Sequence, residues 1–291
     1  MIKTNLEKWN SRISGWVCVF GEDAASYLQS QFSNDLRGAT ERLCTYGLFL
    51  SLKGRVRADA FICQTGPERF EVVSYNCPSK ELCSLLEENV IADEVDFTVR
   101  EIGTTFVVAA ETLPVIPDAS LIFPGRRMRE SHFDVVFSSG STTIPDKELE
   151  HIRVKDGIPS VPFDIGYGEL PQEAGLESVA ISFEKGCYLG QEVMARLKAM
   201  GRVQRHLYHV SGFSNTPTSL AGINCNGQPA GEIRSVISDE CAGKWYGLAL
   251  IRRRFAESDS SPKWTLENGN TLEVGEFTGC LLYTSPSPRD S

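Results

Sequence analysis

The feature that most constrains this chain is the segment 184–201, where a cysteine stands in a glycine-bounded turn directly before a helical pattern. From Gln191 onward, apolar residues recur at the spacing of one helix face. The unpaired N–H groups of a helix start and the ammonium of Lys185 both favour a thiolate at Cys187, whereas Glu192 opposes it if its carboxylate points the same way. The pattern predicts a reactive or ligand-donating thiol, and the alternative is a small apolar filler behind a tight turn.

This segment resembles the signature of the YgfZ family. The matching positions are Lys185, Gly186, Cys187, Tyr188, Gly190, Gln191, Glu192 and Arg196. Members of that family are folate-binding proteins related to the aminomethyltransferase, or T protein, of the glycine cleavage system, and they include mitochondrial relatives that act in iron–sulfur cluster maturation. The resemblance extends over most of the chain, from about Trp16 to about Phe255. It implies that Cys187 is the functional thiol and that the other matching positions belong to the same site.

The composition is that of an ordinary soluble globular protein, with 41% hydrophobic and 23% charged residues. A net charge of -9 argues against a general nucleic-acid or membrane-surface binder, since either needs a basic face. The run Arg252–Arg254 is the best candidate for a local basic patch, and a solvated strand edge is the alternative. No stretch approaches the apolar length of a membrane span, and the first residues lack signal or transit character, so we expect a cytoplasmic protein.

The cysteines also indicate a reduced compartment. All nine are scattered, without the tight spacing that preorganises zinc or a cluster, so we expect no metal site. Such a set is the usual reduced inventory of a cytosolic protein. Cys18 and Cys63 lie within apolar alternation and are expected in the core.

The order of the expected elements predicts an α+β fold. The expected strands are 15–20, 43–52, 55–63, 70–75, 95–101, 104–110 and 133–137, and helices are expected after residues 23, 78 and 146. Lys53-Gly54 predicts a hairpin turn, and Asp23 and Asp146 are expected helix caps. Hairpins mixed with returning helices favour α+β layers over a doubly wound sheet.

The C-terminal part has a different pattern. Short strands with frequent glycines, at 204–210, 230–237, 243–251 and 264–274, predict a small antiparallel β-barrel. We therefore expect aminomethyltransferase-like folate-binding layers over 1–201, in two intertwined subdomains, and the barrel over 202–279. The segment 280–291 resembles translated sequencing-adapter read-through, and a disordered natural tail is the alternative.

The resemblance to the YgfZ family also implies which residues contact the folate. These are Trp16, Asn34, Asp35, Lys53, Arg57 and Glu173. The alternatives are that Trp16 only covers the core and that the hairpin charges, including Arg55, only aid solubility. The chain departs from the family at Leu149, about where some members carry a second pocket tryptophan.

Three functions remain open. The first is a tetrahydrofolate-binding accessory factor for assembly or repair of iron–sulfur clusters, and so of iron–sulfur enzymes such as tRNA-modifying ones. Its partners would be iron–sulfur client or assembly proteins, with no direct nucleic-acid or membrane contact, and the protein would be non-enzymatic or weakly catalytic. A lone cysteine cannot hold a four-iron cluster, so thiols from partners would be needed.

The second function is a folate-dependent aminomethyltransferase, in which Asp59, Asp164 or Glu173 would relay a proton. The third is a folate-binding or interaction module with an inert Cys187. The cysteine signature favours the first, because one-carbon transfer from an amine needs a carboxylate or water relay rather than a thiol.

Overall fold

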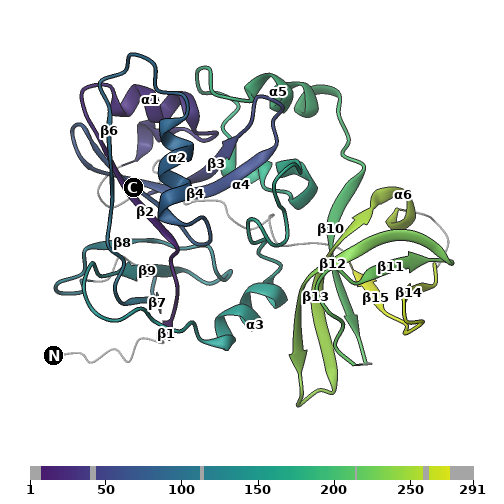
Figure 1. Ribbon diagram of the computed structural model, residues 1–291. Coiled ribbons are helices and arrows are strands. Elements are labelled where there is room, and N and C mark those ends of the chain that lie inside the picture. Colours follow the sequence, from purple (N-terminus) through teal and green to yellow (C-terminus); the bar gives the residue numbers. More distant parts are fainter. Residues whose placement is uncertain (1–7, 40–43, 112–114, 214, 258–261, 276–291) are drawn as a thin grey trace.

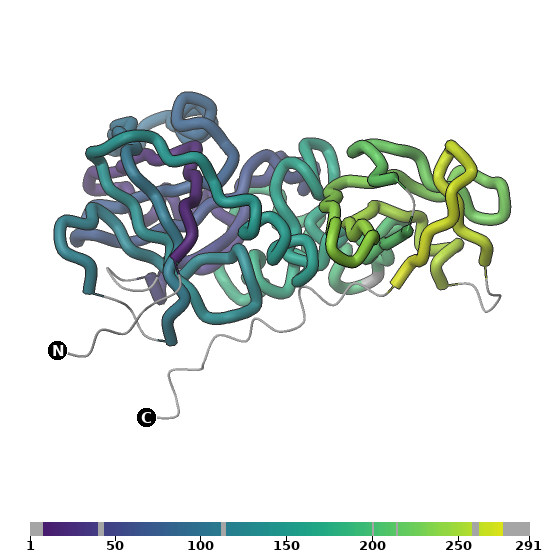
Figure 2. Tube along the Cα trace, turned by 90° about the horizontal axis from the view of Figure 1, so that it is seen from below, coloured from purple at the N-terminus to yellow at the C-terminus, as the bar shows by residue number. Residues whose placement is uncertain are grey.

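The computed structural model describes residues 8–39, 44–111, 115–213, 215–257 and 262–275. These residues form three sheets, in which every strand pair is antiparallel. Two sheets and most helices form one body, and the third sheet forms a second body beside it (Figure 1). Figure 2 shows the two bodies end to end, with the C-terminal one in green and yellow. The arrangement is α+β, as the element order predicts.

The central sheet has the strand order β3-β4-β5-β2-β6 and carries helices on one face. Its strands are β2 (Gly15–Phe20), β3 (Thr45–Leu50), β4 (Val56–Gly66), β5 (Arg69–Ser74) and β6 (Asp96–Val99). Helices α1 (Ala24–Gln31) and α2 (Ser79–Glu87) pack on that face through a cluster that includes Val17, Leu28 and Leu82. Since side chains alternate across a strand, a second apolar set, which includes Trp16 and Phe61, covers the other face.

Strands β3 and β4 form the hairpin that the sequence predicts at Lys53-Gly54. Gly54 has a φ of +67°, which favours glycine, and a Cβ there would lie 2.6 Å from Cε of Met194. The turn is therefore shaped to receive helix α5 (Gln191–Met200).

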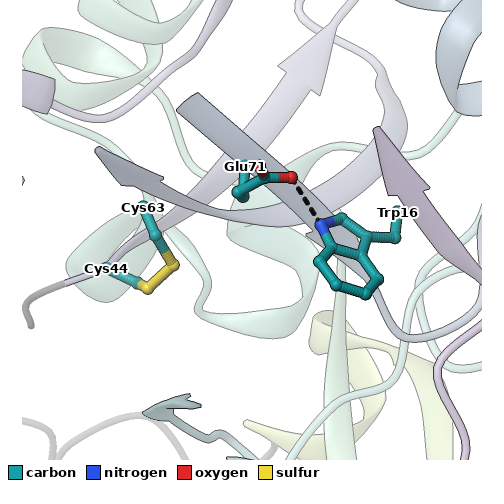
Figure 3. The surroundings of a disulfide bond; sticks show 4 residues. All are labelled: Trp16, Cys44, Cys63 and Glu71. Atoms are coloured by element: carbon teal, nitrogen blue, oxygen red, sulfur yellow. Dashed lines mark hydrogen bonds between the residues drawn. A yellow bond between two sulfur atoms is a disulfide. The ribbon is translucent and has the colours of Figure 1, made fainter. Parts of the chain in front are cut away.

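The same hairpin carries a disulfide between Cys44 and Cys63 (Figure 3). Thr45 faces Ile62 across the strands, so the next residues outward, the two cysteines, face each other with Cα atoms 4.2 Å apart. The expectation of a wholly reduced set is therefore wrong for this pair, although Cys63 is buried as predicted. Cys18 is buried and free, as expected.

A second sheet, of order β1-β7-β9-β8, packs against the other face of the central sheet. Its strands are β1 (Lys8–Asn10), β7 (Thr105–Ala109), β8 (Leu121–Pro124) and β9 (His132–Val136). Strands β1 and β8 are missing from the sequence prediction because each is a short edge strand with a single neighbour.

The aspartates expected to cap helices serve other bonds. Asp146 precedes α3 (Lys147–Asp156), yet its Oδ2 accepts from the backbone N–H of Asn10 at 2.6 Å. Asp23 precedes α1, and its Oδ2 accepts from the backbone N–H of Glu94 at 2.8 Å. Both residues stand at the predicted N-cap positions, but neither side chain makes a capping hydrogen bond to its helix. Each carboxylate instead ties a helix start to a distant segment.

Irregular chain links α3 to α5. It contains the short helices η2 (Pro171–Ala174) and α4 (Glu177–Ala180), and a further short helix, η1 (Leu36–Gly38), follows α1.

The C-terminal body is a curled half-barrel rather than the closed barrel that the sequence predicts. Its strands are β10 (Arg205–Gly212), β11 (Gly222–Cys225), β12 (Gln228–Asp239), β13 (Lys244–Arg252), β14 (Trp264–Leu266) and β15 (Glu273–Gly275). The order is β14-β11-β12-β13-β10-β15, and the outer strands do not pair within the described residues. Helix α6 (Arg253–Ala256) follows β13, and a core around Trp245 fills the concave side.

Strand β11 is absent from the sequence prediction, although the chain carries a signal for it. Asn226 and Gly227 both have positive φ, of 49° and 79°, which is the geometry of a two-residue hairpin turn. The tail beyond residue 279, including Cys280, lies outside the described residues. In the part of the chain that is described, no helix has both the length and the apolar character needed to cross a membrane.

Candidate functional site

Cys187 lies exposed on the loop between α4 and α5. The loop is anchored to the end of α1 by Lys185, whose Nζ donates to the backbone carbonyls of Gln29, Phe32 and Asn34 at 2.7, 2.7 and 2.8 Å. The backbone N–H of Leu189 also donates to this region, to the carbonyl of Ser30 at 3.0 Å. The thiol is therefore displayed on a fixed loop.

The glycine and the tyrosine of the motif fix the other end of the loop. Gly190 has a φ of +86°, and a Cβ there would lie 2.7 Å from the carbonyl oxygen of Ser51 in the β3–β4 turn. Tyr188 is buried in the core cluster beneath the loop, and Gln191 donates to the carbonyl of Lys185 at 3.5 Å. No atom would lie within 4 Å of a Cβ at Gly186, so close packing does not explain that glycine.

The charged residues of the motif do not surround the thiol. The ammonium of Lys185 donates its three hydrogen bonds to backbone carbonyls. Burial lowers the pKa of this ammonium to about 8. Glu192 pairs with Arg196 at 2.7 Å, and both side chains are exposed. The Lys185 ammonium is thus bonded to the end of α1, and both its effect on the Cys187 thiol and the reactivity of that thiol stay predictions.

A cavity of 580 Å³ lies between the central sheet, the segment after α3 and strand β12 of the half-barrel. Asp59 from β4 lines it and is buried, with 5% of its surface exposed. Tyr46 donates its hydroxyl to Asp59 Oδ2 at 3.0 Å, and Ser74 lies 3.5 Å from Oδ1. Burial raises the pKa of the Asp59 carboxyl to about 6, because the charged form loses its hydration.

The cavity wall from the second sheet is cationic. The guanidinium of Arg126 lies 4.3 Å from the centre of the Tyr46 ring. Its backbone is held by Tyr75, whose hydroxyl accepts from the Arg126 N–H at 2.9 Å and donates to Asp134 at 2.6 Å. Arg127 donates to the other oxygen of Asp134 at 2.8 Å. This network fixes where Arg126 enters the cavity.

Two more arginines join the cavity to the half-barrel. Arg153 donates to Asp164 at 2.6 Å and to Ser235 of β12 at 2.7 Å. Arg234, also on β12, pairs with Glu169 at 2.5 Å, while its buried Nε has no hydrogen-bond partner among the described residues. The cavity therefore offers aromatic rings, one protonatable carboxyl and several guanidinium groups.

The folate contacts implied by the family resemblance lie outside this cavity. Trp16 is buried and donates its indole N–H to Glu71 at 2.7 Å (Figure 3). Asn34 bonds the carbonyls of Tyr46 and Val179, and Asp35 pairs with Arg37. These placements leave the three contacts as predictions.

The other three implied contacts are also absent from the cavity lining. Lys53 is exposed in the hairpin turn, and Arg57 pairs with Glu88. Glu173 accepts from Arg205 at 2.9 Å. Leu149, where some family members have a tryptophan, is buried beside Trp9.

Of the acids considered for a proton relay, only Asp59 lines the cavity. Asp164 is fixed by Arg153 and by the backbone N–H of Ser160, and Glu173 is bound to Arg205. The sequence holds a signal for Asp59, since a carboxylate in the apolar run from Ala58 to Cys63 is unusual in a buried strand. The described residues contain no group of three or more potential ligands that could hold a metal ion.

Comparison with known proteins gives relatives over most of the chain. The mouse mitochondrial iron–sulfur cluster assembly factor IBA57 is 27% identical, with 81% of this chain and 75% of the relative covered. The tRNA-modifying protein YgfZ of Aliivibrio fischeri is 25% identical, with 72% and 73% covered. An uncharacterized protein of Haemophilus influenzae is 26% identical, with 65% and 68% covered. No family model matches the chain.

Among solved structures, the chain is similar to the glycine cleavage system aminomethyltransferase T from Bartonella henselae. The TM-score is 0.74 at 13% sequence identity, and the match covers 94% of this chain and 84% of that structure. The fold is therefore aminomethyltransferase-like.

Proposed function

We propose, for a chain that belongs to the family of the YgfZ and IBA57 proteins, a tetrahydrofolate-binding accessory role in the assembly or repair of iron–sulfur clusters. In this proposal Cys187 supplies the working thiol and the cavity beside Asp59 holds the folate. The partners are iron–sulfur client or assembly proteins, and the location is the cytoplasm. Iron–sulfur enzymes such as tRNA-modifying ones would depend on it.

The observation that carries the proposal is the way in which Cys187 is held. Three motif residues hold the loop in place. Lys185 bonds three backbone carbonyls, Tyr188 packs in the core, and Gly190 allows a close approach to the backbone of Ser51. The cysteine between them serves no packing role, because it is exposed. A frame that presents one exposed thiol suits a protein that donates a ligand to a cluster shared with a partner.

The cavity fits a folate by size and by chemistry. Its 580 Å³ lies in the usual range of ligand pockets. Tyr46 and Tyr75 offer aromatic surface for a pterin or benzoyl ring, and the carboxyl of Asp59 can bond ring N–H groups. Arg126 and the unpartnered Nε of Arg234 suit the carboxylates of a glutamyl tail. When bound, the folate would supply one-carbon chemistry, while these residues would hold and orient it.

We do not favour the aminomethyltransferase alternative. The relatives that match over most of their length are an assembly factor and tRNA-modifying proteins, whereas the transferase likeness is one of fold at 13% identity. Binding folate gives no transition-state stabilisation by itself.

Calorimetric titration with tetrahydrofolate tests the folate part directly. We expect saturable binding to the full chain, and we expect Asp59→Asn to weaken it about tenfold through loss of a charge-assisted bond. Lys147→Ala, exposed at the start of α3 and outside the cavity lining, is the matched control and should bind normally. Lys53→Ala tests the contact that the family resemblance implies on the exposed turn. Absence of saturable binding would overturn the folate proposal, and a loss with Lys53→Ala alone would move the site to the hairpin.

A further inference from the structure

A second cleft, of 510 Å³, lies where the chain passes from α5 into β10 and the half-barrel. Its walls come from η2, α4 and the loop after α4, from the end of α5, and from the segment that leads to β10 (Figure 1). It shares no lining residue with the cavity beside Asp59. It is therefore a separate feature, and the inference drawn from it is independent of the proposed function.

One wall of this cleft carries two hydrogen-bond acceptors without donors. Oε2 of Glu177 and Oε1 of Gln172 are both buried, and neither has a partner among the described residues. The amide nitrogen of Gln172 points instead to the sulfur of Met194 at 3.3 Å. Burial raises the pKa of Glu177, which shows how poorly its charge is compensated. Buried acceptors without donors destabilise a fold, so the site calls for a donor from outside the chain.

The lining of the cleft also includes apolar and cationic side chains. Ile181, Phe183 and Leu197 contribute hydrocarbon surface. Lys198 lies with its ammonium 4.0 Å from the centre of the Phe183 ring. Arg202 is exposed and makes no hydrogen bond or ion pair with any described residue.

We propose that this cleft binds a small carboxylate that carries an amino or amide N–H group at its opposite end. The N–H group would satisfy Glu177 and Gln172, the apolar part would lie against Phe183 and Leu197, and the carboxylate would meet Arg202. The donor, the apolar part and the anion of the ligand match the three kinds of side chain that line the cleft, which are acceptors, hydrocarbon and cations. An ordered water could satisfy the acceptors alone, but it would leave the apolar wall and Arg202 without a role.

The test uses three probes that separate these features: 4-aminobenzoate, benzoate without the amine, and aniline without the carboxylate. Binding to the full chain is measured by ligand-observed NMR up to about 10 mM probe, where weak complexes are still detectable. We expect 4-aminobenzoate to bind about tenfold or more tightly than either partial probe, because each lacks one charge-assisted bond. Equal binding of all three, or binding of none, would overturn the proposal in favour of ordered water.

Variants locate the probe. Glu177→Met and Arg202→Met should each weaken 4-aminobenzoate about tenfold, whereas Asp59→Asn, in the other cavity, should leave it unchanged. Loss of binding with Asp59→Asn alone would place the probe in the folate cavity and refute the second site. Arg202 is exposed, so its variant remains informative if Glu177→Met fails to fold.

A stability measurement distinguishes a ligand-binding role of Glu177 from a structural one. Without ligand, Glu177→Met should raise the midpoint of thermal unfolding, because it removes a carboxylate whose Oε2 is buried without a partner among the described residues and puts an apolar side chain of similar size in its place. A lowered midpoint would mean that Glu177 supports the fold, and it would contradict its assignment to a ligand.

Discussion

The Cys187 loop and the cavity beside Asp59 are built in opposite ways. The loop presents one exposed thiol, and the neighbouring motif residues hold it by backbone contacts. The cavity buries Asp59, Arg126 and Arg153, and its lining includes residues of β3, β4, the segment before β9, α3 and β12. In the loop, the Cys187 thiol takes no part in the contacts that hold the loop. In the cavity, the groups proposed to bind the ligand also make contacts that hold the fold together.

This difference separates what a mutation can reveal. A change at an exposed atom that carries no packing should alter function without altering stability, whereas a change at a buried charged group alters both. The cavity also joins the two bodies, since Arg153 bonds Ser235 and Arg234 pairs with Glu169. Variants in the cavity must therefore be judged with stability data in hand.

The largest expected effect is the loss of function in Cys187→Ser. The hydroxyl keeps the shape of the side chain but cannot supply thiolate chemistry or a cluster ligand. We expect complementation to be abolished in a cell that lacks its own family member, with the midpoint of thermal unfolding unchanged within about 1 °C. Folate affinity should stay nearly intact.

The matched control is Cys241→Ser, which alters the other exposed free cysteine of the described residues and should complement fully. Native-state alkylation adds a second check, in which Cys187 should react faster than the buried Cys18. Full complementation by Cys187→Ser would show that the thiol is not the working group.

The next largest effect concerns stability, in Lys185→Met. Lys185 is 5% exposed and donates to three carbonyls at the end of α1, and methionine would leave those acceptors without their donor. We expect the free energy of unfolding to fall by about 3 kcal/mol, measured by urea denaturation. Lys53→Met, on the exposed turn, should change it by less than about 0.5 kcal/mol. Equal effects in the two variants would mean that Lys185 does not hold the loop.

In the cavity, Asp59→Asn should change the free energy of unfolding in the opposite direction and stabilise the protein at pH 7. The folded-state pKa of Asp59, about 6, lies above its ordinary value of 3.8, so the folded protein binds the proton more tightly than the unfolded chain. Its contribution to stability is full below pH 3.8 and is lost as the pH rises through 6. At pH 7 the asparagine variant should be more stable by about 1 to 2 kcal/mol.

Urea denaturation of both proteins at pH 4 and pH 7 checks this expectation. The stability difference should shrink at the lower pH, where Asp59 is neutral as well. Glu184→Gln changes an exposed acid on the Cys187 loop and serves as the control. A variant that is less stable at pH 7 would show that the charged carboxylate is compensated in the cavity.

The same contrast explains what the sequence could predict. The Cys187 loop could be recognised because its motif residues lie within a dozen positions, although the groups that they contact in α1 and in the β3–β4 turn are distant in sequence. The β3–β4 hairpin is readable for the same reason. Cys44 and Cys63 are equally distant from the hairpin turn at Lys53-Gly54, so their facing positions could also have been inferred.

The cavity could not be predicted in this way, because its lining is assembled by tertiary contacts. Tyr46, Arg126, Arg153 and Arg234 come from four elements, and no spacing rule brings them together. The half-barrel was predicted in outline, since its strands alternate, but closure depends on whether β14 and β15 meet. Their pairing is decided by the curl of the sheet rather than by a local pattern.

The smallest expected change in stability is that of Arg196→Ala, which tests where the loop site ends. Arg196 pairs with Glu192 one turn earlier on α5, and their side chains are 68% and 85% exposed. Such a pair contributes less than about 0.5 kcal/mol to the free energy of unfolding, so the urea midpoint should hardly move.

The family signature includes Arg196, although this residue adds little to the stability of the fold. We therefore expect Arg196 to contact the partner that approaches Cys187. Complementation should then fall several-fold while folate affinity stays unchanged, with Lys147→Ala, at the start of exposed α3, as the control. Undiminished complementation would confine the working site to the loop and exclude the exposed face of α5.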